Sequence, residues 1–181
     1  MHTEPLYRPW GTPTTDFWQT AVAIEAGSSA PAAGQSESVR ERLVHVAVAA
    51  ANGNLDDATT LAEKIDRDAT AEYGESNRNT IEAREVRGYL AHLRGDQNAA
   101  VGWYLHSVRL RAGVQGAGHP DTVEAARRAY SLWRSVPDGP DAQRLGVELL
   151  ATVTDVLGAD SAVADRTRDR LAMPRAQALP S

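Results

Sequence analysis

The chain has 181 residues, a formal net charge of −5 and no cysteine, which excludes a disulfide framework and a cysteine zinc site. The negative charge disfavours general affinity for nucleic acid or anionic membranes, because both depend on clustered positive charge. No apolar run approaches the roughly 18 residues of a membrane-spanning helix, and no secretory signal pattern opens the sequence. We therefore expect a soluble cytoplasmic protein.

Residues 1–38 are expected to form an N-terminal segment outside the main domain. A short amphipathic helix is predicted over about 15–26, and the stretch 27–38 (GSSAPAAGQSES) is typical of a flexible linker. The apolar side of this helix carries Phe17, Trp18, Ala21 and Ile24. Because such side chains should not remain exposed, the helix is expected to cap the main domain, to fill its groove, or to reach a second copy and form a homodimer.

The rest of the chain repeats at an interval of 42 residues, as Gly74, Gly116 and Gly158 show most clearly. Other columns that recur at this interval are Gly53 with Gly95, Ala58 with Ala100 and Ala142, Leu61 with Trp103 and Leu145, and Thr80 with Thr122. A fixed period of 20 to 50 residues is the signature of stacked repeats.

Apolar residues recur at helical spacing throughout this region, the stretches end at glycine, and no strand pattern occurs. The sequence therefore predicts an all-α fold of three helical hairpins and a capping helix. The expected repeats cover about 39–74, 79–116 and 121–158, the cap covers about 160–172, and 173–181 is a disordered tail.

The turns between these helices resemble those of the tetratricopeptide repeat, in the 42-residue form of kinesin light chains and many bacterial proteins. The hairpin turns read GNLDDA from Gly53 and GDQNAA from Gly95, and the turn between repeats reads GAGHPDT from Gly116. The resemblance covers about residues 37–172 and implies an α-solenoid. The third hairpin departs from the pattern, because Pro137 stands where the family has glycine.

In this family the first helix of each hairpin lines a concave groove in which a peptide or partner protein docks. Carried over in register, the groove positions are Arg40, Leu43, Ala47, Ala50 and Ala51, then Glu82, Glu85, Tyr89, His92 and Leu93, then Glu124, Arg127, Ser131, Arg134 and Ser135. Arg127 and Arg134 share one helix face, and two guanidinium groups there suit a carboxylate. The other interpretation is that both are solvated arginines paired with Glu124 or Asp121.

No pattern of catalytic, metal-binding or cofactor-binding residues stands out. The histidines lack the close spacing of metal ligands, no nucleophile elbow is present, and GVQGAG at 113–118 does not follow a strand as a phosphate loop would. His119-Pro120-Asp121 matches the tripeptide of J-domain cochaperones, but it lies within the predicted turn between repeats. We expect no catalytic residue, metal or cofactor.

The expected function is therefore that of a non-enzymatic bacterial adaptor with a protein or peptide partner. The alternative is a ligand- or peptide-sensing regulatory accessory that acts on a separate effector or transcription regulator. Aromatic residues at helical spacing are interpreted as core between hairpins rather than as a ligand cage, with Tyr89 as the exception to examine.

Overall fold

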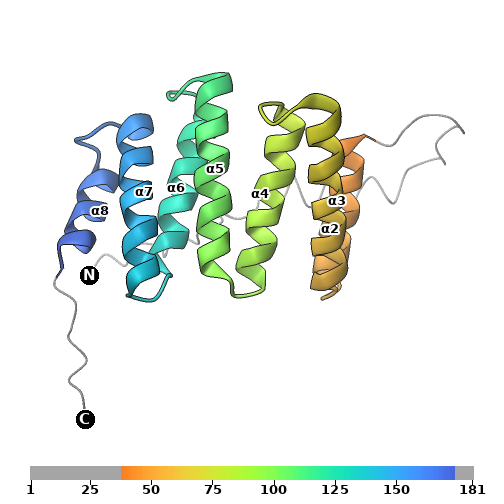
Figure 1. The fold of residues 1–181 in the computed structure, drawn as a ribbon, viewed down its shortest axis with the longest axis horizontal. Coiled ribbons are helices and arrows are strands. Elements are labelled where there is room, and N and C mark those ends of the chain that lie inside the picture. The colour runs from red at the N-terminus through yellow and green to blue at the C-terminus, as the bar shows by residue number, and fades with distance from the viewer. Residues whose placement is uncertain (1–37, 174–181) are drawn as a thin grey trace, which may run out of the picture. The chain divides into compact units, whose positions relative to one another are not determined.

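The computed structural model describes residues 38–173, which form seven α-helices and no strand (Figure 1). This confirms the all-α class. The helices are α2 (Val39–Ala51), α3 (Leu55–Tyr73), α4 (Arg78–Leu93), α5 (Gln97–Gln115), α6 (Pro120–Arg134), α7 (Pro140–Leu157) and α8 (Ala162–Ala172). The predicted helix over 15–26, nearly all of the linker and the tail beyond Met173 lie outside the described residues.

The helices belong to two compact units, and the division falls after Arg94. The first unit holds α2, α3 and α4, and the second holds α5 to α8. The first and third predicted hairpins, α2–α3 and α6–α7, each lie within one unit, whereas the helices of the second are divided between the units. Among the helices described, none is long and apolar enough to cross a membrane.

The 42-residue repeat corresponds to one turn geometry that occurs three times. Gly74, Gly116 and Gly158 end α3, α5 and α7 with φ of 83°, 92° and 93°, where a side chain would be strained. Each glycine N–H donates to the carbonyl four residues earlier, over 3.0–3.1 Å. The residue three positions later caps the next helix with its side chain, and these caps are Asn77, His119 and Ser161.

His119-Pro120-Asp121 therefore has a structural role in the second of these turns. The His119 side chain accepts a hydrogen bond from the Asp121 N–H through Nδ1, at 3.2 Å. Pro120 occupies the first position of α6, where no backbone N–H is needed for the helix. The tripeptide thus begins a helix in the manner expected of a turn between repeats.

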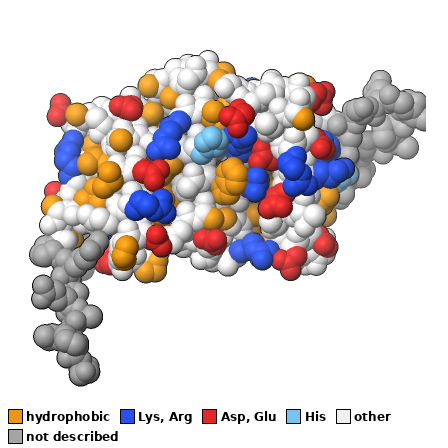
Figure 2. Space-filling model, viewed as in Figure 1, with side chains coloured by type: hydrophobic (Ala, Val, Ile, Leu, Met, Phe, Trp, Pro, Cys, Tyr) orange, Lys and Arg blue, Asp and Glu red, His pale blue; other side chains and the backbone are white. Residues whose placement is uncertain are grey.

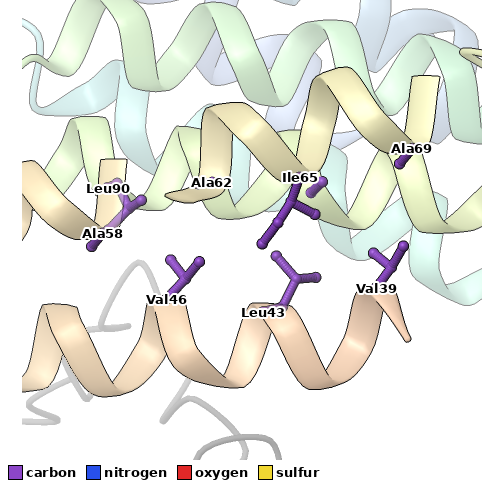
Figure 3. Packing of buried hydrophobic residues seen from close by; sticks show 9 residues of the cluster. Val39, Leu43, Val46, Ala58, Ala62, Ile65, Ala69 and Leu90 are labelled. Atoms are coloured by element: carbon purple, nitrogen blue, oxygen red, sulfur yellow. The ribbon is translucent and has the colours of Figure 1, made fainter. Parts of the chain in front are cut away.

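Apolar residues on one side of α2 form the core of the first unit with α3 and α4. Figure 3 shows Val39, Leu43 and Val46 of α2 pointing toward Ile65 of α3, with Leu90 of α4 at one end of the cluster. Small residues on α3 let the helices approach closely, namely Ala58, Ala62 and Ala69.

A buried ionic network joins α3 to α4. The carboxylate of Asp66 accepts hydrogen bonds from Arg84 Nε at 3.1 Å and from Arg87 Nη1 at 2.7 Å. The side chains of Asp66 and Arg84 are only 8% and 7% exposed. Arg84 also pairs with Glu75, and Arg87 with Glu63, at 3.1 and 3.3 Å. Because both charges of the central pair are desolvated, removal of either one leaves the other without compensation.

The second unit fills the equivalent positions with apolar side chains. One period after Asp66, Arg84 and Arg87 the sequence has Val108, Ala126 and Ala129, all fully buried. Val108 and Ala126 belong to one apolar cluster between α5 and α6. The same three repeat positions thus hold charged side chains in one unit and apolar side chains in the other.

Arg170 of α8 bonds to the turn between α6 and α7, which contains Pro137. Its guanidinium donates to the carbonyls of Trp133 and Val136, each at 2.7 Å, and to Asp138 at 2.8 Å. It also lies 4.4 Å from the centre of the Trp133 ring. The Trp133 carbonyl, which also accepts from the Val136 N–H at 3.1 Å, and the Val136 carbonyl are thus both bonded from α8, 37 and 34 residues away in sequence.

Trp133 is 1% exposed, and its size is accommodated by a glycine on α7. Its indole N–H donates to the Ala142 carbonyl at 2.7 Å. A Cβ atom added to Gly146 would lie 2.6 Å from Trp133 Cζ2 and 2.7 Å from Leu171 Cδ2. Any larger residue at position 146 must therefore displace the indole ring or α8.

We predict that Asp66→Ala lowers the free energy of unfolding by about 3 kcal/mol, because Arg84 and Arg87 lose their buried carboxylate. The triple variant Asp66→Leu/Arg84→Met/Arg87→Met removes all three charges at similar volume and should lie within about 1 kcal/mol of the parent. Urea unfolding followed by circular dichroism measures both. A loss below about 1 kcal/mol for Asp66→Ala would show that the network behaves as an exposed ion pair.

We predict opposite effects for two glycine-to-alanine substitutions within helices of the second unit. Gly146→Ala should destabilise by about 1–3 kcal/mol through overpacking against Trp133. Gly102→Ala, where an added Cβ meets no atom within 4 Å, should stabilise α5 by about 0.5–1 kcal/mol. Thermal and urea unfolding of the two variants test this, and equal effects would exclude the proposed contact with the indole.

Candidate functional site

The predicted groove residues of α2 are divided between surface and core. Arg40 is exposed, whereas Leu43 and Ala47 are only 2% and 3% exposed. The prediction that Leu43 and Ala47 line a groove is therefore wrong. Leu43 belongs to the core cluster with Leu90, because α4 packs against α2 as well as against α3. The small side chain of Ala47 is likewise buried in the first unit.

The predicted residues of α4 are partly buried and engaged. Glu82 accepts a hydrogen bond from Arg78 Nε one turn earlier, at 2.8 Å. Glu85, Tyr89 and His92 are each half-buried and have interactions of their own. Burial raises the pKa of the Tyr89 phenol above its usual value, because the phenolate would be poorly solvated there. This side of α4 therefore offers a neutral aromatic group rather than free charge.

On α6 the acidic residues near the predicted site are already paired. Glu124 accepts from Arg128 Nε at 3.3 Å, one helical turn away. Asp121 lies 3.7 Å from Arg111, whose side chain is buried. Ser131 is partly exposed between the two predicted arginines. Neither acidic residue is therefore engaged with Arg127 or Arg134, as the solvated-pair interpretation would require.

Arg127 and Arg134 are both exposed and have no acidic partner within residues 38–173. Arg134 lies over the ring of Tyr130, 6.0 Å from its centre, which directs its guanidinium. Elsewhere, acidic and basic side chains alternate over the face shown in Figure 2. Arginines without a neighbouring carboxylate are thus the groups most available to an anionic partner.

The spacing of these two arginines limits what they can bind together. Seven residues of α-helix place their Cα atoms about 10 Å apart along the axis. Two carboxylates separated by a similar distance match this spacing better than one carboxylate does. Ser131 adds a hydroxyl group between them, on the same helix.

Arg166 on α8 was missed by sequence reasoning. It is exposed, and no acidic partner for it occurs in the described part of the chain. It lies 42 residues after Glu124, and α8 packs against α6 as well as α7. The repeat period was the signal that could have found it, because α8 begins 42 residues after α6 begins.

The structure also bears on the aromatic and metal interpretations. Trp133 and Tyr104 are buried, as expected of core residues, whereas Tyr89, Tyr130 and Trp103 are half-buried. Among the described residues, no group of three or more histidine, aspartate or glutamate side chains is arranged to hold a metal ion.

In comparisons with known proteins, neither a family model nor a curated protein matches this sequence. The resemblance to the tetratricopeptide repeat thus depends on the residues of the chain itself.

We predict that Tyr89→Phe removes one tyrosine that titrates above the usual pKa of 10.0. Because a raised pKa favours the neutral phenol in the folded state, stability is retained below pH 10 and is lost as the pH rises through the folded-state value. The variant should lose less stability than the parent above pH 10. Tyrosinate absorbance and unfolding at several pH values measure this. The prediction is contradicted if the tyrosine that disappears from the titration of the variant has an ordinary pKa.

Proposed function

We propose that this protein is a non-enzymatic bacterial adaptor of the tetratricopeptide-repeat type. In this proposal three helical hairpins and a capping helix form a short cytoplasmic solenoid, which binds a peptide or a partner protein rather than nucleic acid or membrane, and uses no cofactor. The turn that recurs at Gly74, Gly116 and Gly158, with a helix cap three residues later, supports the repeat interpretation. Repeat proteins of this kind act mainly by presenting a binding surface.

The observation that carries the proposal is the pair of exposed arginines on α6. Arg127 and Arg134 face the same side of the helix, and the nearby acids Glu124 and Asp121 are paired with other arginines. A guanidinium without an intramolecular carboxylate can form charge-assisted, bidentate hydrogen bonds to a partner's carboxylate. The binding surface on the second unit is therefore suited to an acidic peptide.

The spacing of the arginines suggests the form of the peptide. An extended polyproline-II segment advances about 3.1 Å per residue with three residues per turn, so acidic groups three residues apart lie on one side of it, about 9 Å apart. This matches the axial spacing of two helical turns. We therefore expect an extended segment with carboxylates at positions i and i+3, one of which can be the terminal carboxylate.

We predict that Arg127→Ala and Arg134→Ala each weaken binding of such a peptide about ten- to hundredfold, since a hydrogen bond to a charged group contributes about 1.5–3 kcal/mol. Fluorescence anisotropy with a labelled panel measures this. The panel contains peptides with acids at i and i+3, at i and i+1, and with glutamine in their place. Binding should also weaken as salt is raised.

Arg67→Ala is the matched control, because Arg67 is an exposed arginine on α3 with no acidic partner in the described part of the chain. It should leave the affinity unchanged. Equal affinity for the acidic and glutamine peptides, or equal losses for Arg67→Ala and Arg127→Ala, would exclude the α6 surface as the binding site. Affinity-purification mass spectrometry that compares Arg127→Ala with the parent then identifies the protein whose capture depends on this arginine. The identity of that protein distinguishes an adaptor from a regulatory accessory that acts on a separate effector.

A further inference from the structure

Helix α2 is apolar on every side over its second half. Its residues from Val46 to Ala51 are VAVAAA, and its polar side chains all lie in the first half. A helix that is apolar all round is normally buried on all sides. The described part of the first unit covers only one side of α2, through α3 and α4.

The uncovered side carries a short apolar stripe. Val44 and Val48 are one turn apart, both are partly exposed, and neither belongs to the core cluster or packs against it. Ala51 continues the stripe and is exposed. On the helical wheel these three residues lie within about 60° of one another, and Val46, which points into the core, lies on the opposite side.

The repeat register shows what covers the position of Val48 elsewhere in the chain. One and two periods after Val48 lie Leu90 of α4 and Leu132 of α6, both buried. The helices that pack closely against α4 and α6 from the preceding repeat are α3 and α5. At α2 the same column is partly exposed, and among the described residues no helix precedes α2.

We propose that residues 15–26 pack against the Val44–Val48–Ala51 stripe of α2 in the same chain. Moving the bounds of α3, Leu55 and Tyr73, back by 42 residues gives 13–31, a window that contains the predicted helix. Its apolar residues Phe17, Trp18 and Ile24 supply the missing hydrocarbon. In this proposal the segment packs against α2 in the way that α3 packs against α4.

The connecting chain is long enough for this contact within one molecule. Residues 27–37 number eleven and can span at most about 36–40 Å when extended. Helix α2 has 13 residues and is about 20 Å long. The segment can therefore reach any part of the stripe without a second copy. The inference does not depend on the function proposed for α6.

Hydrogen–deuterium exchange on the full chain tests the proposal. Residues 15–26 and the Val44–Ala51 half of α2 should exchange at least tenfold more slowly than an unstructured peptide. Val48→Asp and the double variant Phe17→Ala/Trp18→Ala should each abolish protection of residues 15–26. The combination of the two should cause no further loss, because both remove the same contact.

Val147→Asp is the control, since Val147 is 58% exposed on α7 in the other unit. It should leave exchange of residues 15–26 unchanged. Substitutions at Phe17 and Trp18 lie outside the described core, so this variant remains informative if Val48→Asp fails to fold. Unprotected exchange of 15–26 in the parent, or unchanged protection in the double variant, would overturn the proposal. So would a dimer by light scattering that dissociates in the double variant, since this would show contact between chains.

Discussion

The glycine turn at the end of every second helix is the constraint on which the rest of the structure depends. At Gly74, Gly116 and Gly158 the chain has positive φ, and four residues, the glycine first, separate one helix from the next. This spacing determines which face of each helix meets its neighbour. The ionic contact between α3 and α4 and the apolar contact between α5 and α6 both take place between faces that these turns have brought together.

Within this common frame the units stabilise equivalent contacts by different chemistry. Asp66 with Arg84 and Arg87 forms a buried ionic network, where one period later Val108 packs with Ala126. Buried charges at these positions are stable only when each has an oppositely charged partner, whereas buried apolar residues need only to fill the available volume. A repeated turn can therefore keep its geometry while the contacts between its helices change.

The site could be predicted only in part. All the candidate groove residues lie on α2, α4 or α6 except Ser135, which caps α6, and the repeat register gave no indication that Leu43 and Ala47 are buried. Burial depends on how closely α4 approaches α2, which is a property of the packed unit. Likewise, the availability of Arg127 depends on Glu124 and Asp121 bonding elsewhere, and either pairing is compatible with the sequence.

The sequence by itself determined the all-helical class, the glycine turns and the register of the repeat, because these follow from local backbone preferences and short-range periodicity. The tertiary structure alone decided which charges are paired and which remain available. Arg84 meets Asp66 across 18 residues of sequence, and Arg170 reaches the carbonyl of Trp133 across 37. Such contacts depend on the final distance between helices, and no local pattern encodes that distance.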